Sequence, residues 1–382
     1  MITHDQFEKK YPRADLIRFK CLGESLQKNS IEVVYVASND RGRFEESFYK
    51  GSKVFKVPFV SRVRMIQILC FYLFLIPALL TVRKHRPFHI IFVNSVLSIP
   101  YACFFKWFCR NGHIQFDLMG ILSEEKFLRR SKNLRTRTAK RMVSSIEDFL
   151  LSRVDFITTI NDQHKRILLN RVRRPVYVVR DGVFNATLQR ASVARDPIEN
   201  GKILLIFVGQ VSHFRLDPLF RLLPELVTLI PNLHVQVGGV GPQLERYRGM
   251  VESGGLAEYV TFLGHVPYEN VFDTIAKADI AYSDDWSING FPMKLFDYMA
   301  LGKAIIAEGT ESVKELLINQ VNGLLYRTEA EMKEKIVALA KDVALRKRLG
   351  QTAREMMDLH TWEKRVEALG ALYYQFLGLM GI

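Results

Sequence analysis

Cysteine and tryptophan are scarce in this chain, which has four of the first and three of the second among 382 residues. The cysteines lie among apolar residues and lack the close spacings of a metal module. The sequence therefore favours reduced, buried thiols over a disulfide framework. The first residues, Ile2 to Asp15, are polar and charged and contain no apolar stretch typical of a signal peptide. We expect a cytoplasmic protein.

Acidic residues are missing from residues 51–110, which contain nine Lys and Arg and no Asp or Glu. Residues 1–190 hold 34 basic against 16 acidic side chains, a net charge of +18. Residues 191–382 hold 20 against 24, a net charge of −4. The basic excess predicts an anionic partner for the first half alone. Nucleic acid explains it less well, because no recognised binding motif accompanies the charge.

The most apolar run of the chain, Ile66 to Val82, lies inside this basic stretch. A transmembrane helix needs about 20 apolar residues, whereas this run has 17 and includes Gln67 and Pro77. A helix buried in the core is a second interpretation. We favour a third, a helix that lies partly in the interfacial layer of a membrane. The basic residues in 62–86 and in a second cluster at 129–141 would then meet anionic head groups.

Apolar strand-like segments alternate with helical segments along the whole chain, a pattern typical of α/β proteins with parallel sheets covered on both faces. In the first half we expect strands at Met1–Thr3, Ile31–Ala37, His89–Asn94, Ile114–Phe116, Phe156–Ile160 and Val176–Val179. In the second half we expect them at Ile203–Val208, His234–Val237, Val260–Phe262, Ile280–Tyr282, Ala304–Ala307 and Leu324–Tyr326.

A polar, irregular segment at residues 185–201 separates the two halves and predicts a linker. The length suits two domains of ordinary size. We expect Rossmann-like domains at residues 1–188 and 189–360, and a C-terminal helix at 361–382 that crosses back to the first domain. In open sheets of this type, ligands bind outside the carboxyl ends of the strands. The sequence thus predicts an active cleft between two facing domains.

The stretch from Asn289 to Ala307 carries the clearest chemical signal. A glycine turn precedes a helix that is expected to begin near Met293 and to end at Gly302. Lys294 places a cation in the first turn, and Asp297 follows one turn later on the same face. A cation beside a glycine turn suits a phosphorylated ligand, and a nearby carboxylate suits sugar hydroxyls. Both residues are also consistent with an ordinary solvated helix start.

Further candidates follow other predicted strands. Gly209 would let a ligand approach the backbone, and Arg215 could pair with a phosphate. The glycine cluster at 238–242 could serve a ligand or simply a turn. Asp284 and Asp285 lack a third metal ligand, so we interpret them as a solvated loop and expect no metal.

The second half resembles glycosyltransferase family 4, a group of retaining sugar-nucleotide transferases with the GT-B fold. The resemblance rests on motifs in the family's order: FVGQ at Phe207–Gln210, VGGVGP at Val237–Pro242, FLGHV at Phe262–Val266, KADIAYS at Lys277–Ser283, GFPMKLFDYMALGKAIIA at 290–307 and NGLLY at Asn322–Tyr326. It covers residues 200–375, and extends more loosely through residues 1–190.

The resemblance implies a role for each matching position. The family's Glu-x7-Glu element falls on Asn289 and Asp297, so the turn would hold the donor hexose and pyrophosphate and Asp297 the ribose. The implied donor-binding residues are Gly209, Gln210, Arg215, Gly239, Val266, Asn289, Gly290, Phe291, Pro292, Met293, Lys294 and Asp297. Asn289, Arg215 and Lys294 would be catalytic. Asp117 and Glu124 would contact the acceptor.

Four positions depart from the family pattern, namely Asn289, Asp297, Gln210 and Met119. The resemblance implies a metal-independent hexosyltransferase without a cofactor beyond a UDP- or GDP-sugar. It would transfer the hexose to a lipid-linked glycan in surface polysaccharide synthesis, peripherally associated with the inner membrane. The departures leave a second interpretation open, a catalytically degenerate GT-B subunit that binds a glycan or a partner at the membrane.

Overall fold

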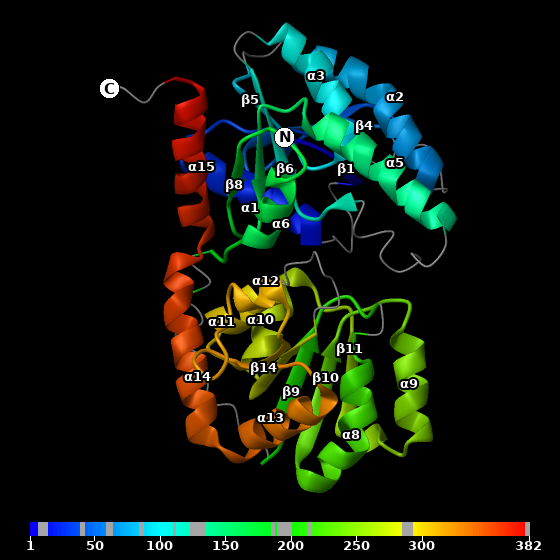
Figure 1. Ribbon diagram of the computed structural model, residues 1–382, viewed down its shortest axis with the longest axis vertical. Coiled ribbons are helices and arrows are strands. Elements are labelled where there is room, and N and C mark those ends of the chain that lie inside the picture. Colours follow the sequence, from blue (N-terminus) through cyan, green and yellow to red (C-terminus); the bar gives the residue numbers. More distant parts are fainter. Residues whose placement is uncertain are drawn as a thin grey trace. The chain divides into compact units, whose positions relative to one another are not determined.

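The computed structural model describes residues 1–6, 14–38, 43–58, 64–83, 88–109, 112–122, 134–184, 188, 201–212, 215–284 and 293–378. The chain forms two compact units (Figure 1). The first comprises Met1–Arg180 together with Trp362–Ile382, and the second comprises Asp181–Thr361. Each unit contains one largely parallel sheet with helices on both faces, and the predicted α/β class is confirmed.

The first unit contains an eight-stranded sheet in the order β3-β4-β2-β1-β5-β6-β7-β8. The strands are β1 (Ile2–Gln6), β2 (Val34–Ser38), β3 (Glu45–Tyr49), β4 (Ser52–Val57), β5 (Ile90–Val93), β6 (His113–Leu118), β7 (Phe156–Thr159) and β8 (Val176–Val178). All pairs are parallel except β3 with β4. The apolar sequences of β2, β5 and β7 agree with burial under helices on both faces.

The β3–β4 hairpin is a strand pair that the sequence analysis did not predict. Lys50 and Gly51 form its turn with φ values of 47° and 88°. Positive φ at both central residues is typical of a type I′ turn, whose twist suits a hairpin. Lys50 is an unusual choice at such a position, where Asn or Asp is the common signal. The missing turn signature explains why the hairpin was overlooked.

Helices of the first unit cover the sheet on opposite sides. They are α1 (Ala14–Lys28), α2 (Arg64–Arg83), α3 (Ile99–Phe108), α5 (Leu134–Leu151), α6 (Asp162–Leu169) and α15 (Trp362–Phe376), with the short helix η1 (Val96–Ser98). Figure 1 shows α2, α3 and α5 side by side, and α2 and α5 both contact α3. On the other face, Phe19 of α1 packs against Tyr35 and Phe92 of the sheet.

The apolar helix α2 has two different faces. Its buried side chains, among them Phe71, Leu75 and Leu79, pack into the core of the first unit. Leu69 and Leu73 on the other side are 60% and 63% exposed. One face of α2 therefore packs in the core, as the core-helix interpretation expects, and the other face is exposed; the interfacial interpretation stays a prediction. No helix within the described ranges is long and apolar enough to cross a membrane.

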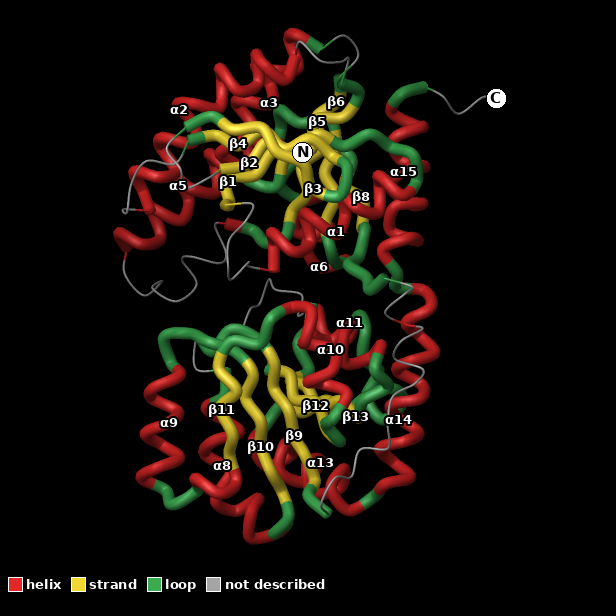
Figure 2. Tube along the Cα trace, turned by 180° about the vertical axis from the view of Figure 1, so that it is seen from behind, coloured by secondary structure: helices red, strands yellow, loops and turns green. Residues whose placement is uncertain are grey.

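The second unit contains a six-stranded parallel sheet in the order β11-β10-β9-β12-β13-β14 (Figure 2). Its strands are β9 (Ile203–Val208), β10 (Leu233–Gly238), β11 (Val260–Gly264), β12 (Ile280–Ser283), β13 (Ala304–Glu308) and β14 (Leu324–Tyr326). Its helices are α8 (Asp217–Leu229), α9 (Leu244–Ser253), α10 (Tyr268–Ala276), α11 (Lys294–Ala300), α12 (Glu311–Lys314), α13 (Glu329–Lys341) and α14 (Val343–Met356), with η2 (Ala257–Tyr259) and η3 (Met357–Leu359). Because sequential strands are parallel, their carboxyl ends all meet at one edge of the sheet.

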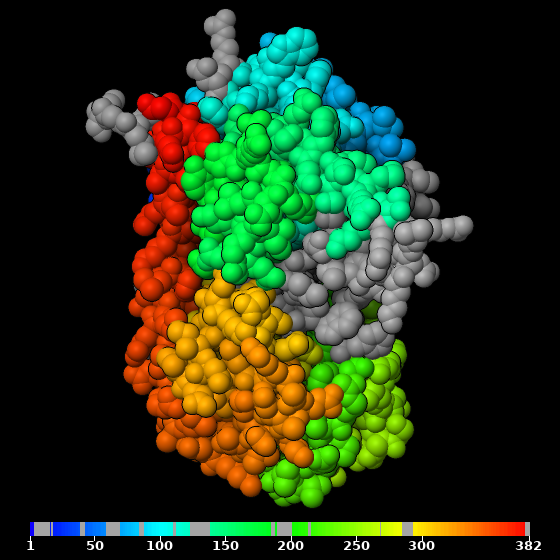
Figure 3. All heavy atoms as spheres, viewed as in Figure 1, coloured from blue at the N-terminus to red at the C-terminus, as the bar shows by residue number. Residues whose placement is uncertain are grey.

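The last helix, α15, is part of the first unit although it ends the chain. Phe376 stacks on Phe156 of β7 with ring centroids 4.2 Å apart, and Tyr373 donates a hydrogen bond of 2.7 Å to Gln115 of β6. Figure 3 shows this red segment alongside the green segment of the same unit. Aromatic stacking and a buried hydrogen bond thus fix the C-terminal helix to the sheet at β6 and β7.

Asp117 lies in the centre of a buried ionic network that ties α1 and α15 to β6. Its carboxylate accepts hydrogen bonds from Arg18 at 3.0 and 3.1 Å, from Thr158 at 2.7 Å and from Arg365 at 3.3 Å. Both guanidinium groups are almost wholly buried. This arrangement gives Asp117 a structural role that sequence reasoning did not anticipate, and its predicted contact with an acceptor stays a prediction.

Replacing Asp117 tests the network. Asp117→Ala should lower the free energy of unfolding by about 3 to 5 kcal/mol, because it leaves two guanidinium groups buried without their shared partner. Asp162→Asn is the control, since its pair with Arg180 is half exposed and should contribute about 1 kcal/mol or less. Urea unfolding followed by the fluorescence of buried Trp362 measures both. Equal losses for the two variants would contradict a stabilising role for the network.

Candidate functional site

Three glycine-containing loops lie side by side at the carboxyl ends of β9, β10 and β11. The amide of Gly209 donates to the carbonyl of Gly238 at 2.8 Å. The amide of Gly239 donates to the carbonyl of Gly264 at 2.6 Å. The loops therefore continue the pairing of the strands beyond the sheet itself. The backbone atoms of these three loops form one surface, which we call the glycine floor. It lies at the edge where open α/β sheets bind ligands.

Glycine is required at two of these positions by close backbone contact. A Cβ atom on Gly239 would lie 1.8 Å from the carbonyl oxygen of Gly209, and one on Gly241 would lie 2.1 Å from that of Val211. Gly239 also has a φ of 146°, which disfavours any other residue. Beside them, Val266 lies against Gly238, within 3.0 Å of where its Cβ would be. Close packing between backbones therefore requires glycine in this cluster, whereas a turn alone would not require it at both positions.

Two cations approach this floor. Lys294, the first residue of α11, places its Nζ 3.8 Å from the ring centroid of Phe207 on β9. The same Nζ lies 3.3 Å from the position of a Cβ on Gly209. Arg215 follows the β9 loop, and its Nε is buried without a hydrogen-bond partner within the described part of the chain. A lysine held over an aromatic face and an arginine with an unused donor can bind an anion.

Asp297 lies in the middle of α11. Its side chain is half buried, and burial raises the pKa of its carboxyl to about 7. The next residue, Tyr298, is fully buried, accepts from the amide of Val208 at 3.0 Å and donates to the carbonyl of Tyr282 at 3.3 Å. Tyr298 thus fixes α11 to β9 and β12. The helix presents Lys294 and Asp297 at neighbouring turns, as the sequence predicted.

The structure adds two carboxyl groups that sequence reasoning did not assign to the site. Asp284 follows β12 and is 2% exposed, which contradicts the interpretation of this residue as part of a solvated loop. Burial, and then the neighbouring carboxyl of Glu308 at the end of β13, raise the pKa of Asp284 to about 8, although Lys294 and Arg215 act in the opposite direction. Both carboxyl groups lie at the carboxyl ends of parallel strands. Because these strands were predicted from the sequence, their carboxyl groups could have been assigned to the site as well.

Several predicted residues lie outside the described part of the chain. They are Asn289, Gly290, Phe291 and Pro292 of the turn before α11, and Glu124 of the first unit. Their predicted roles stay predictions. Of the others, Met293 caps the start of α11 and Gln210 is exposed on the β9 loop. Within the described residues, no group of three or more His, Cys, Asp or Glu could hold a metal ion.

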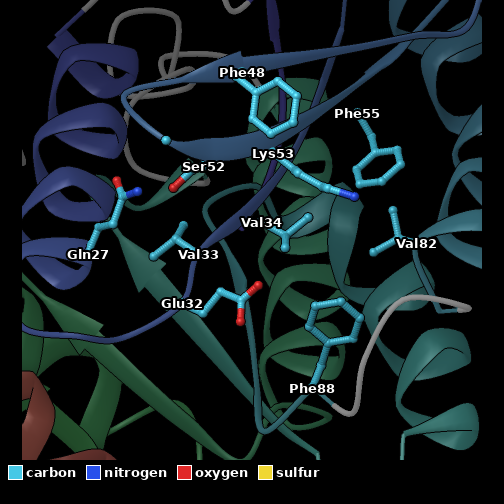
Figure 4. Close-up of a pocket in the computed structure, with 11 residues that line it drawn as sticks. Gln27, Glu32, Val33, Val34, Phe48, Ser52, Lys53, Phe55, Val82 and Phe88 are labelled. Carbon is cyan, nitrogen blue, oxygen red and sulfur yellow. The ribbon is translucent and has the colours of Figure 1, made fainter.

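A pocket in the first unit is lined by none of these residues (Figure 4). It has a volume of about 270 Å³ and is lined mainly by apolar side chains, among them Val34, Phe48, Phe55 and Phe88. Val34 begins β2, and Phe88 precedes β5, so the pocket lies at the amino ends of the strands. Ligands of open α/β sheets bind at the opposite ends. We therefore do not assign this pocket to the candidate site.

The comparisons with known proteins agree with this placement. Residues 189–356 match the family described as "Glycosyl transferases group 1". This part of the chain is similar to the group 1 glycosyltransferases. The matched range contains all three glycine loops, both cations and Asp297. The resemblance predicted from the motifs is thereby confirmed.

Curated relatives match a similar part of the chain. An uncharacterised glycosyltransferase of Methanocaldococcus jannaschii is 28% identical over 171 residues, which are 44% of this chain and 43% of the relative. The GPI3 subunit of phosphatidylinositol N-acetylglucosaminyltransferase of Saccharomyces cerevisiae is 22% identical over 209 residues, 53% of this chain and 45% of the relative. The matches thus span less than half the length of these relatives.

Solved structures match the whole chain. Sucrose-phosphate synthase from Thermosynechococcus elongatus has a TM-score of 0.78 at 17% identity, with 99% of this chain and 98% of the other covered. HepE of Anabaena in complex with UDP and glucose has a TM-score of 0.70 at 13% identity, with 97% and 98% covered. The predicted GT-B fold is confirmed.

The contact between the glycine loops can be tested by matched substitutions. Gly239→Ala should lower the free energy of unfolding by about 2 to 3 kcal/mol or more, because the new methyl overlaps the carbonyl of Gly209. Gly249→Ala is the control, since Gly249 lies exposed in α9 with open space around it. It should raise the free energy of unfolding by about 0.5 to 1 kcal/mol. Thermal unfolding compares them, and a stabilised Gly239→Ala variant would refute the contact.

Proposed function

We propose that the protein is a retaining glycosyltransferase. It moves a hexose from a UDP- or GDP-sugar to a hydroxyl of a lipid-linked glycan in the synthesis of a surface polysaccharide. The observation that carries the donor half of this proposal is the floor of glycine loops with Arg215 and Lys294 beside it. Main chain that a diphosphate can approach closely, together with two cations, suits a sugar nucleotide.

In this proposal, Arg215 and Lys294 neutralise the diphosphate, as a bound metal ion would. The bond between the anomeric carbon and the diphosphate breaks while the acceptor oxygen bonds to the same carbon. The acceptor proton passes to the departing phosphate oxygen, and attack from the leaving-group face retains the configuration. Arg215 and Lys294 stabilise the charge that develops on the diphosphate, with Asn289 as the proposed contact to the hexose. Such preorganised groups are each worth about 3 to 4 kcal/mol in other enzymes.

The lipid-linked acceptor is proposed from the names of relatives. One relative is the phosphatidylinositol N-acetylglucosaminyltransferase subunit described above. Another is a phosphatidyl-myo-inositol mannosyltransferase of Mycolicibacterium smegmatis, 23% identical over 208 residues, 53% of this chain and 52% of the relative. Both names describe sugar transfer to a lipid. They support a lipid-borne hydroxyl as the acceptor for this chain.

An exposed apolar surface in the first unit supports the same acceptor class. Apolar side chains are exposed along α2, α3 and α5: Leu69, Leu73, Phe74, Ile76 and Leu80 on α2, Trp107 on α3, and Met142, Ile146 and Phe149 on α5. We call these nine side chains the apolar face. Trp107 is 83% exposed. Exposing so much of an indole ring to water costs free energy, and an apolar partner would remove that cost.

Basic groups lie next to the apolar face. The guanidinium of Arg83 lies 4.7 Å from the ring centroid of Phe108, and that of Arg153 lies 4.6 Å from that of Phe149. Lys140 and Arg141 follow on α5. A cationic rim around exposed apolar side chains is the composition that binds anionic interfaces. We propose that the protein is cytoplasmic and binds the inner membrane peripherally through this surface. The basic residues Arg62, Lys84, Arg86, Arg129, Arg130 and Lys132 of the predicted segments 62–86 and 129–141 lie outside the described residues.

Calorimetric titration with UDP, GDP, CDP and ADP tests the donor assignment. One of them should bind without metal, and magnesium should leave its affinity nearly unchanged, because the two cations already neutralise the diphosphate. Arg215→Ala should weaken that binding about 10- to 100-fold by removing charge-assisted hydrogen bonds. If none of the four nucleotides binds, the proposal fails and a catalytically degenerate GT-B subunit that binds a glycan or a partner becomes the better interpretation.

The same titration tests the ribose contact. A carboxylate must be ionised to accept hydroxyl hydrogens, and the pKa of Asp297 is raised to about 7. Nucleotide affinity should therefore be complete above pH 7 and fall as the pH drops below it. Asp297→Asn should remove this pH dependence and weaken binding. Asp273→Asn, at an exposed position of α10, should leave the pH dependence and the affinity unchanged. Unaltered nucleotide affinity in Asp297→Asn would contradict the assignment of Asp297 to the ribose.

Vesicle flotation tests the apolar face. The protein should float with vesicles that contain phosphatidylglycerol and less with phosphatidylcholine alone, and added salt should weaken binding because each basic residue contributes about 1 kcal/mol. Leu73→Glu should abolish flotation without touching the core, since Leu73 is 63% exposed. Leu169→Glu introduces the same change at an exposed position of α6 and should float like the unmodified protein. Equal flotation of the two variants would exclude the apolar face as the membrane-binding surface.

A further inference from the structure

The pocket in the first unit lies where the β3–β4 hairpin meets the end of α2. It has a volume of about 270 Å³, and its apolar lining consists of Val33, Val34, Phe48, Phe55, Val82 and Phe88. Figure 4 shows the three phenylalanine rings and Val82 around it. Val82 lies in the last turn of α2, a helix that contacts both β2 and β4. Neither the proposed donor contacts nor the transfer step uses this pocket.

Strand register explains why the pocket is open at one side. Phe48 of β3 pairs with Lys53 of β4, and Lys53 pairs with Val34 of β2. Side chains of paired residues project from the same face of a sheet, so these three form one row across the hairpin and β2. Val34 at the inner end of the row is half-buried, whereas Phe48 on the edge strand is 72% exposed. The pocket therefore opens to solvent beside Phe48.

Lys53 places a cation in the middle of this row. Within the described part of the chain it makes no hydrogen bond, ion pair or ring contact, whereas Lys50 and Lys56 of the same hairpin each pair with a glutamate. Figure 4 shows its side chain extending toward Phe55 and Val82. An ammonium group among apolar side chains costs free energy unless an anion compensates it. Lys53 can therefore hold an anionic group at the pocket.

Three further polar side chains, Gln27, Glu32 and Ser52, line the pocket. Ser52 is 3% exposed, and its Oγ has no hydrogen-bond partner among the residues that the structure describes. A buried donor of this kind costs free energy until an acceptor reaches it. Glu32 is exposed and makes no ion pair with Lys53 in the same part of the chain, so water and salt screen its charge. The unused donors of Ser52 and Lys53 thus favour a ligand that carries anionic oxygen atoms.

Exposed aromatic side chains connect the pocket to the apolar face. Phe44 is 49% exposed, and its ring packs edge-on against Phe74 of α2, with the centroids 6.0 Å apart. Phe74 is one of the side chains of the apolar face. Phe44 and Phe48 are four positions apart, so the alternation of an extended chain places both on the same side of the hairpin. Apolar surface therefore extends from α2 to the opening of the pocket.

We propose that the pocket binds an anionic amphiphile, with its acyl chain among the apolar side chains and its head group at Lys53 and Ser52. The net charge of +18 over residues 1–190 favours a ligand of the same sign. The pocket belongs to the first unit, whereas the glycine floor belongs to the second. This inference therefore does not rest on the proposed sugar transfer. The same chemistry fits a free fatty-acid anion and a single-chain phospholipid.

Calorimetry with decanoate, kept below its micelle concentration and without vesicles, tests the pocket. One decanoate should bind per chain. Decylammonium has the same alkyl length and the opposite charge, and it should bind at least about tenfold more weakly because Lys53 repels it. Octanoate is shorter by two methylene groups and should bind about 15-fold more weakly at full burial of the chain. Absence of decanoate binding, or equal affinity for any two of these ligands, would overturn the inference.

Lys53→Glu reverses the charge at the pocket and should reverse the preference between the two charged heads. Decanoate affinity should fall at least about tenfold, and decylammonium should become the tighter ligand. A purely structural role of Lys53 would weaken both ligands alike. Lys50→Glu is the matched control, because Lys50 is exposed on the same hairpin and does not line the pocket. Reversal in both variants, or in neither, would contradict the assignment to Lys53.

A further ligand distinguishes the two sources of the acyl chain. Lysophosphatidylglycerol with a decanoyl chain carries the anionic head of a membrane lipid. If it binds more tightly than decanoate, the pocket serves a phospholipid, and if it binds more weakly, the pocket serves a free fatty acid. Binding of neither ligand refutes the site. Absence of nucleotide binding by a preparation that binds decanoate overturns the proposed function and leaves this pocket assignment standing.

Discussion

The contact between the backbones of Gly209 and Gly239 is the constraint on which the candidate site depends. A methyl group on Gly239 would overlap the carbonyl of Gly209 at 1.8 Å, so the loops after β9 and β10 can come together only without side chains. Their closeness leaves main chain exposed at the sheet edge. It also lets Lys294 of α11 reach the same place, with its Nζ beside Gly209. Small residues here create space for a ligand and a cation at once.

Charge in the second unit is balanced locally and not over its whole surface. The net charge of residues 191–382 is −4, yet two cations converge on the glycine floor. Phe207 supports the lysine through its ring face. A buried cation normally costs free energy unless it is compensated. Here the aromatic ring supplies part of that compensation, which leaves capacity for an anionic ligand.

The first unit uses one helix for two purposes. One side of α2 supplies core side chains, and the other side belongs to the apolar face that we propose binds a membrane. Pro77 lies within the helix and does not end it. The buried network of Asp117 with Arg18 and Arg365 fixes α15 to the same unit. The buried charges are thus explained by their partners, and a membrane is the partner that we propose for the exposed apolar side chains.

Because buried parallel strands are continuous apolar runs, the strand pattern was predictable from the residues alone; β9 and β14 were placed at their observed bounds. The sequence also placed Gly209 after a strand and Lys294 at a helix start, with Asp297 one turn further along that helix. Only the tertiary structure showed that Asp284 is buried near Glu308, since residues 24 positions apart become neighbours through the pairing of β12 and β13. It also decided which side of α2 is exposed, because an all-apolar helix has no sequence signal for its outer face.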